Sequence, residues 1–315
     1  MRLGTRSALA LAVGAIALGA TAGILAALCQ RQQPALQLPA RNERDGPPVV
    51  ESEKTTATSL SRAAALLAVS ALADIATEHF RGSFHNPVML LPLMVGAQAV
   101  AVNLQGVFEY TPATNTIRAA GQMLTVTTGV IGLAFHFYNV TKRPGGWSWY
   151  NLFYAAPLGA PAALCLVGLL GGIGERLRHD QQEIIGMESS PLVTGLVAVG
   201  LLGTSAEAAL LHFRGAYQNP AMFIPVTLPP IAAGLLAAAY RSQQWMRPAR
   251  LSMRVLIGVG LLGAAFHAYG VQRAMGGWRN WSQNLLNGPP LPAPPAFTAL
   301  AIAGLGALDL AEQRA

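Results

Sequence analysis

Four histidines are the residues of this sequence whose type and spacing could support chemistry. His79 opens the segment HFRGSFHNPVM, which returns from His212 as HFRGAYQNPAM, at an offset of 133 residues (212 − 79). A second pair, His136 and His267, follows at an offset of 131 residues (267 − 136). A fixed offset of this kind is typical of an internal repeat, so most of the chain is predicted to be two copies of one unit.

Two histidines in each copy suit a bis-histidine haem. In a four-helix bundle such a haem takes one axial imidazole from each of two helices. We therefore expect His79 to pair with His136, and His212 with His267, each pair holding one haem b. The alternative is that a histidine in the last turn of a helix only complements the helix dipole or caps its carbonyl groups.

Glycines accompany the second histidine of each copy at helical spacing. Positions i, i+3 and i+7 fall on one face of a helix. A flat macrocycle could lie against a face of glycines while the imidazole binds its iron. The alternative is close packing of two helices through small residues. The predicted cofactor-binding glycines are Gly129 and Gly132 before His136, and Gly260 and Gly263 before His267.

An arginine follows the first histidine of each copy by two residues. Arg81 and Arg214 are expected near the membrane interface, where they could hold haem propionates. The planar guanidinium binds carboxylates through two parallel hydrogen bonds, which favours this role. The alternative is an arginine whose charged end reaches the interface without binding a cofactor.

An acid precedes the first histidine of each copy by five residues. Asp74 and Glu207 are both predicted to lie inside an apolar span. An ionisable group at that depth is costly unless it is paired or neutral. Two interpretations stay open: structural pairing with the arginine seven residues later, or a proton relay or ion site.

The rest of the duplicated motif predicts the end of one helix and the start of the next. Gly82 stands where a helix ends, and glycine adopts the left-handed cap conformation at little cost. Asn86 and Pro87 match an N-cap followed by proline in the first helical position.

Composition indicates the class of protein. The chain is 52% hydrophobic and 11% charged, whereas soluble domains carry about 25% charged residues. Several continuous apolar runs reach the ~20 residues that cross a bilayer as helix. The sequence therefore predicts an all-α polytopic membrane protein. The predicted spans of the two copies are 61–80, 88–108, 119–141, 158–174, 192–213, 221–240, 252–272 and 296–310.

The domain organisation follows from the apolar runs and the polar segments between them. We predict an N-terminal transmembrane helix or uncleaved signal anchor at 1–28, a flexible polar linker at 29–60, repeat one at 61–176, a connector at 177–190 and repeat two at 191–315. This makes about nine spans. Four spans are an even number, so both repeats enter the membrane from the same side and are parallel.

Loops that contain paired tryptophans follow the third span of each copy. Trp147 and Trp149 lie in the first loop, and Trp278 and Trp281 in the second. Tryptophans at a membrane boundary are typical of an aromatic belt. The alternative is a lid over a site on that face, for example for a quinone ring.

Charge distribution gives an orientation and excludes some partners. The two HFRG segments lie on one membrane face, called here the HFRG face, and the opposite face gathers 13 of the 21 Lys and Arg residues. The positive-inside rule then places the HFRG face outside the cytoplasm of a multi-pass cell-membrane protein, although Arg2 and Arg6 favour the reverse. The net charge of +7 is explained by arginines near lipid headgroups rather than by nucleic-acid binding.

Cysteines and short motifs exclude several reaction types. Cys29 and Cys165 lie far apart, and the sequence contains no CxxC, HExxH, Walker loop or nucleophile elbow.

Three functions remain open. The first is a redox subunit with b-type haem that takes electrons from a partner subunit and passes them to quinone. The second is a transporter or channel with two parallel repeats. The third is a non-catalytic membrane anchor or assembly protein.

Overall fold

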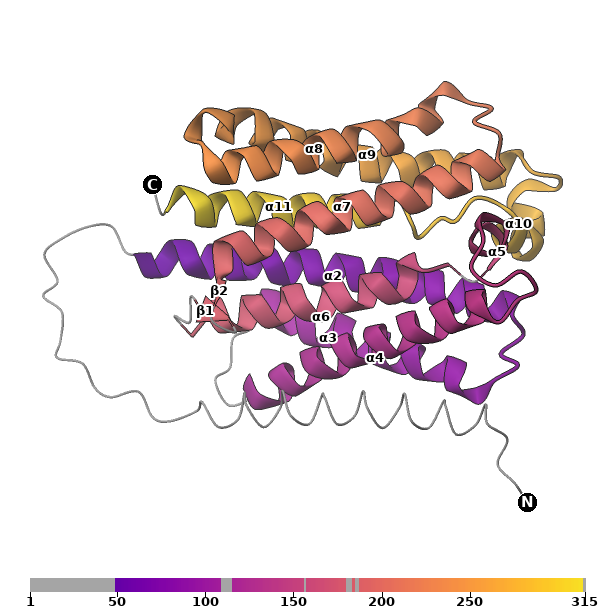
Figure 1. Cartoon of the computed structure of the whole chain (residues 1–315), viewed down its shortest axis with the longest axis horizontal. Coiled ribbons are helices and arrows are strands. Elements are labelled where there is room, and N and C mark those ends of the chain that lie inside the picture. Colours follow the sequence, from indigo (N-terminus) through magenta and orange to yellow (C-terminus); the bar gives the residue numbers. More distant parts are fainter. Residues whose placement is uncertain (1–48, 109–114, 156, 180–182, 185–186, 314–315) are drawn as a thin grey trace, which may run out of the picture. The chain divides into compact units, whose positions relative to one another are not determined.

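The computed structural model describes residues 49–108, 115–155, 157–179, 183–184 and 187–313. The predicted N-terminal helix at 1–28 and the linker up to residue 48 lie outside the described residues. The prediction of an all-α polytopic chain is confirmed for the described part, which is almost entirely helical (Figure 1). Strands β1 (Glu183–Ile184) and β2 (Met187–Glu188) form a short antiparallel hairpin in the connector.

Eight helical segments of the described chain are long and apolar enough to cross a membrane, and each overlaps one predicted span. Shorter helices α5 (Trp149–Tyr154) and α10 (Trp281–Asn287) follow the third and seventh of them. The long helices are α2 (Val49–Arg81), α3 (Leu91–Phe108), α4 (Asn115–Thr141), α6 (Gly159–Leu177), α7 (Ser189–Arg214), α8 (Ile224–Arg241), α9 (Met246–Arg273) and α11 (Pro295–Glu312).

Helix α2 begins earlier than the sequence predicts. It starts at Val49, so the predicted polar linker at 29–60 is wrong from residue 49 onward. Apolar residues that form a buried stripe are interspersed among the polar residues of this stretch. Ala57 and Leu60 are fully buried and belong to the main core together with residues of α6, α7 and α11. These core partners lie far away in sequence, and packing against them stabilises the extra turns of α2.

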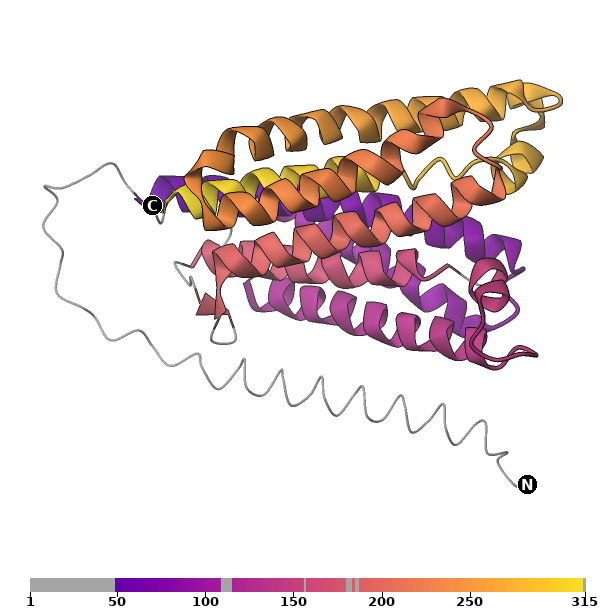
Figure 2. The ribbon, with the colours of Figure 1, turned by 45° about the horizontal axis from the view of Figure 1, so that its top comes forward.

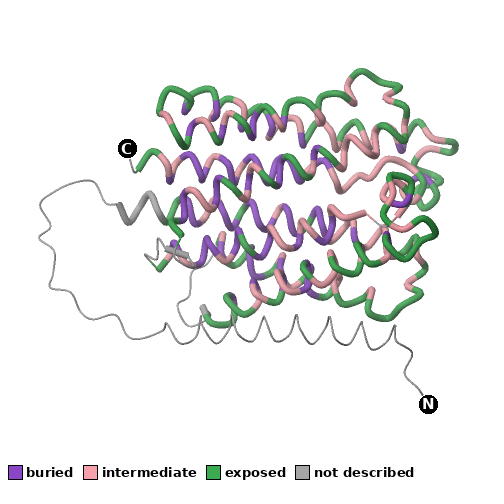
Figure 3. Tube along the Cα trace, viewed as in Figure 1, coloured by how far each residue is buried: buried purple, intermediate pink, exposed green. Residues whose placement is uncertain are grey.

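Three helices form the centre of the bundle. Of the most apolar 18 residues of each span, 56–67% are buried inside the bundle in α2, α6 and α11. The corresponding share is 17–28% in the other five spans. Figure 3 shows the buried residues concentrated along these central helices. The outer helices expose large apolar side chains such as Val199, Leu251 and Leu262. An exposed apolar face of this extent fits a lipid bilayer as the surrounding solvent.

The two HFRG segments form turns of the same geometry. Asn86 Oδ1 accepts a hydrogen bond from the Val88 amide at 3.0 Å, which confirms the predicted N-cap. The predicted left-handed cap at Gly82 is wrong, because the left-handed residues are Ser83 (φ 54°) and Phe84 (φ 45°). Gly82 instead leaves room for Met89, whose methyl group would lie 3.2 Å from an added Cβ.

The second copy repeats these features one by one. Asn219 caps η3 (Pro220–Phe223), and its Oδ1 accepts from the Ala221 amide at 2.9 Å. Ala216 and Tyr217 take left-handed φ values of 55° and 45°. An added Cβ at Gly215 would meet the methyl group of Met222. The matching sequence therefore produces matching local structure.

Candidate functional site

The four histidines lie in the helix ends that point toward the HFRG face. His79 and His212 occupy the last turns of α2 and α7. His136 and His267 lie near the ends of α4 and α9. The short helices α5 and α10 lie at this same end of the bundle, while the β1–β2 hairpin lies at the other (Figures 1 and 2).

Each histidine is hydrogen-bonded through Nδ1 to a backbone carbonyl. His79 Nδ1 lies 2.7 Å from Met89 O, and His212 Nδ1 lies 2.8 Å from Met222 O. The HFRG turn makes this contact possible because it folds the chain back over the helix end. Both contacts span ten residues, so the second copy reproduces the first.

The second histidine of each copy makes the same type of contact with a different loop. His136 Nδ1 lies 2.5 Å from Pro157 O, and His267 Nδ1 lies 2.7 Å from Pro290 O. These prolines precede α6 and α11.

The carbonyl contacts determine which nitrogen carries the proton. A backbone carbonyl only accepts, so Nδ1 must donate, and Nε2 of a neutral imidazole keeps its lone pair. None of the four Nε2 atoms has a hydrogen-bond partner among the described residues. This is the arrangement that metal-ligating histidines adopt, with one ring nitrogen oriented by a carbonyl and the other free for the metal.

One of the predicted ligand pairs is in contact range. The ring centroids of His212 and His267 lie 6.5 Å apart, with an angle of 70° between the ring planes. A metal bound at about 2 Å from each of two imidazole nitrogens holds those nitrogens about 4 Å apart, and the ring centroids lie further out on both sides. The observed separation is compatible with that span. His79 and His136 are close enough to interact electrostatically.

Across the part of the chain that the structure describes, no group of three or more His, Cys, Asp or Glu side chains is placed to hold a metal ion.

The glycine stripe of the first half faces a helix. An added Cβ at Gly129 would lie 2.6 Å from the backbone nitrogen of Cys165 and 2.8 Å from Pro161 O, both in α6. At Gly132 it would lie 3.2 Å from the Pro161 side chain. In the structure α6 therefore lies against the face of these glycines, as the packing alternative describes.

The same holds in the second half. At Gly260 an added Cβ would meet Thr298 N at 2.7 Å and Pro294 O at 2.8 Å, and at Gly263 it would meet Pro294 Cβ at 2.8 Å. Helical spacing shows that residues share a face, but it does not show whether a cofactor or a helix lies against it.

Both arginines of the motif reach across to the other half. Arg81 forms an ion pair with Glu78 and lies 3.5 Å from Leu285 O in α10. Arg214 lies 4.7 Å above the ring of Phe153 in α5. Glu78 has no acidic counterpart in the second copy, where Leu211 stands at the corresponding position. The propionate role of Arg81 and Arg214 stays a proposal.

The two acids have different surroundings. Glu207 Oε1 accepts a hydrogen bond from the Gly159 amide at 3.2 Å, at the start of α6. Helix α6 has no side-chain cap of its own, so Glu207 of the second half caps a helix of the first. Gly159 has no room for a Cβ because the Glu207 carboxylate occupies that space.

Asp74 lacks the equivalent hydrogen bond because the corresponding helix start has no N–H group to donate. The residue that corresponds to Gly159 is Pro292 (292 − 159 = 133), and proline has no backbone N–H to donate. Pro292 O instead accepts from Ser70 Oγ at 2.5 Å. The predicted pairing of Asp74 with Arg81 is not formed, because Arg81 pairs with Glu78. Asp74 and Glu207 interact electrostatically.

The Glu207 cap gives a testable expectation. Glu207→Ala should lower stability by about 1 kcal/mol, the usual cost of removing an N-cap acceptor. Glu207→Gln should cost less, because the amide oxygen can still accept from the Gly159 amide. Asp74→Ala is the matched control and should change little. Thermal unfolding in detergent measures all three, and an equal loss for Glu207→Gln and Glu207→Ala would contradict the cap.

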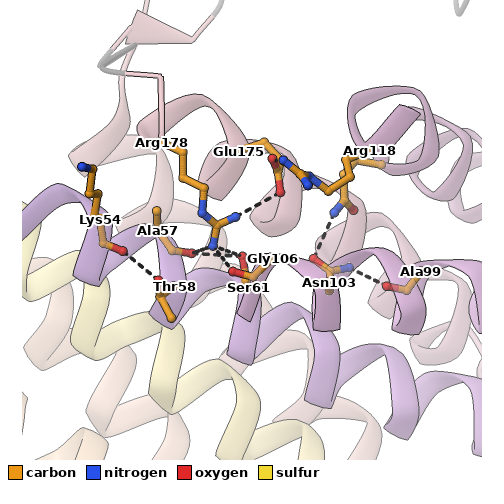
Figure 4. A network of polar contacts seen from close by, with 11 residues as sticks. Lys54, Ala57, Thr58, Ser61, Ala99, Asn103, Gly106, Arg118, Glu175 and Arg178 are labelled. Atoms are coloured by element: carbon orange, nitrogen blue, oxygen red, sulfur yellow. Dashed lines mark hydrogen bonds and ion pairs between the residues drawn. The ribbon is translucent and has the colours of Figure 1, made fainter. Parts of the chain in front are cut away.

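A buried ionic network lies at the opposite face and was not anticipated from the sequence (Figure 4). Arg118 Nε donates to Glu175 Oε2 at 3.0 Å, and Arg178 Nη1 donates to Glu175 Oε1 at 3.1 Å. Arg118 is only 1% exposed. Arg118 and Glu175 lie in the terminal turns of α4 and α6, where the sequence alone gives no reason to expect buried charges.

The network joins four helices. Arg178 Nη2 donates to Ser61 Oγ at 2.9 Å and to Gly106 O, which connects α6 to α2 and α3. Beside it, Gln122 Nε2 of α4 donates to Asn103 Oδ1 of α3 at 3.0 Å (Figure 4).

No family model, no curated protein and no solved structure matches this chain. A functional assignment therefore depends on the geometry of its own residues.

Proposed function

We propose that this protein is a membrane redox subunit in which His79 with His136, and His212 with His267, hold b-type haem and pass electrons to quinone. The observation that supports this most is the shared geometry of the four histidines, with Nδ1 oriented by a carbonyl and Nε2 unpartnered. When bound, haem supplies a one-electron carrier. The protein would supply two imidazole ligands from each histidine pair, and the carbonyl contacts keep each imidazole in the tautomer that can bind iron.

We further infer that the chain consists of two parallel four-helix repeats. Support comes from local features that occur once in each half at corresponding positions. They include the left-handed turns, the Asn caps and the carbonyl partners of the histidines. Another pair lies in the tryptophan loops. Asn151 Nδ2 donates to Gly146 O at 2.7 Å, and Asn284 Nδ2 donates to Gly277 O at 2.8 Å.

The proposed location is the cell membrane, with the HFRG face outside the cytoplasm. Reporter fusions should place the loops near residues 83, 145, 216 and 278 on one side, and those near 113, 182 and 246 on the other. If one member of the first group reports the opposite side from the rest, the parallel arrangement is wrong. If the groups are uniform but reversed, only the orientation changes.

The function is tested by the visible spectrum of the protein purified in detergent from haem-replete cells. A six-coordinate, low-spin b-type spectrum should appear on reduction. A colourless protein without metal by elemental analysis would refute the redox proposal.

A membrane anchor or assembly protein is the second candidate, and one observation favours it. Each histidine ties a helix end to the following loop through its Nδ1 contact. That bond would stabilise the fold without any metal. The histidine variants described in the Discussion separate the two roles.

A further inference from the structure

A pocket opens on α8 at the end of the bundle opposite the HFRG face. Its volume is about 390 Å³, and it is independent of the histidines. The lining residues are Gly234, Ala237, Ala238, Arg241, Ser242 and Trp245.

The inner part of the pocket is an apolar groove. Gly234, Ala237, Ala238 and Arg241 follow the spacing i, i+3, i+4 and i+7, which places them on one helix face. An added Cβ at Gly234 would meet nothing within 4 Å, so this face is not covered by another helix of the described chain. A groove of small residues within a membrane span has the width and polarity to receive an acyl chain.

The outer part of the pocket carries positive charge. Arg241 is exposed and forms no ion pair with any described residue, and Trp245 is 41% exposed. Arg247 and Arg254, in the first turns of α9, are also exposed and without ion pairs in the described chain. Two of the acids at this end, Asp309 and Glu312, are both bound by Arg250, at 2.7 Å and 2.6 Å.

We propose that this pocket binds an anionic phospholipid, with the phosphate at Arg241 and Trp245 and one acyl chain along Gly234 to Ala238. Charge complementarity selects the anionic headgroup, and the apolar groove selects a lipid over a free anion. Basic pockets at the cytoplasmic side of transmembrane helices bind such lipids. The first half has Ala101 and Phe108 at the positions of Gly234 and Arg241 (offset 133), so one site per chain is expected.

The test measures bound lipid by native mass spectrometry, after reconstitution of the full chain in nanodiscs that contain phosphatidylglycerol and phosphatidylcholine. The wild-type protein should retain one phosphatidylglycerol in preference to phosphatidylcholine. Arg241→Ala should weaken retention about fivefold, since one arginine near the surface contributes about 1 kcal/mol. Gly234→Leu should block the groove, and it introduces no clash because the space at Gly234 is open.

Matched controls identify the site. Gly203→Leu changes another glycine with nothing within 4 Å of an added Cβ, and Arg143→Ala removes an exposed arginine from the HFRG face. Both should retain phosphatidylglycerol like the wild type. Three results would overturn the proposal: equal retention of the two lipids, an equal loss in the controls, or displacement of the lipid by millimolar inorganic phosphate together with no effect of Gly234→Leu.

Discussion

His136→Ala should remove about half of the haem signal of the purified protein, because it destroys one of two bis-histidine sites. His79→Ala should remove the same half, and the double variant should lose no more than either single one, since both residues belong to one site. Combining His136→Ala with His267→Ala should remove the whole signal. Reduced-minus-oxidised difference spectra measure each fraction.

Two further variants separate ligation from anchoring. His136→Asn keeps a side-chain donor for Pro157 O but has no imidazole for iron. It should retain more thermal stability than His136→Ala and still lack the haem of its site. His85 is the control, because it lies on the same face, is exposed, and its Nδ1 contacts Gly82 O. If His85→Ala loses as much haem as His136→Ala, the assignment of ligands is wrong.

Glu175→Gln should be the most destabilising single change at the opposite face. It leaves the guanidinium groups of Arg118 and Arg178 buried without the carboxylate that both contact. Breaking a buried ion pair by removing one partner costs about 3–5 kcal/mol. Arg118→Met should cost less, because Glu175 keeps Arg178 as a counter-ion. Thermal unfolding in detergent gives the order of the variants.

The second half provides a matched control for this effect. Arg250 bridges Asp309 and Glu312 between α9 and α11, but its side chain is 24% exposed and those of the acids are 34% and 62% exposed. Exposed ion pairs contribute about 0–1 kcal/mol, so Asp309→Asn should change stability little. A loss as large as that of Glu175→Gln would mean that burial does not determine the cost.

Local features were predictable because neighbouring residues determine them. The eight apolar spans, the Asn-Pro helix start and the position of all four histidines at one end follow from composition, turn chemistry and helical spacing. The duplicated motif also predicted which features would match between the halves. The main local error concerned Gly82, where the need for space and not the left-handed conformation explains the glycine.

Features that depend on helix packing were not predictable. The sequence places Gly129 on the face of His136, but only the fold shows that α6 covers that face. Glu207 and Gly159 are 48 residues apart, and the sequence does not indicate that Glu207 caps the helix that begins at Gly159. It also gives no sign that Glu175 lies between Arg118 and Arg178.

The physical reason is the range of the interactions involved. By itself the sequence determined a helical membrane chain, its turns, and two sets of histidines at the same depth, since periodicity and capping act over a few residues. The tertiary structure decided which groups meet across helices: the carbonyl partners of the imidazoles, the glycine contacts and the buried ion pairs. Those contacts depend on helix order and rotation, which are determined by the packing of the whole bundle.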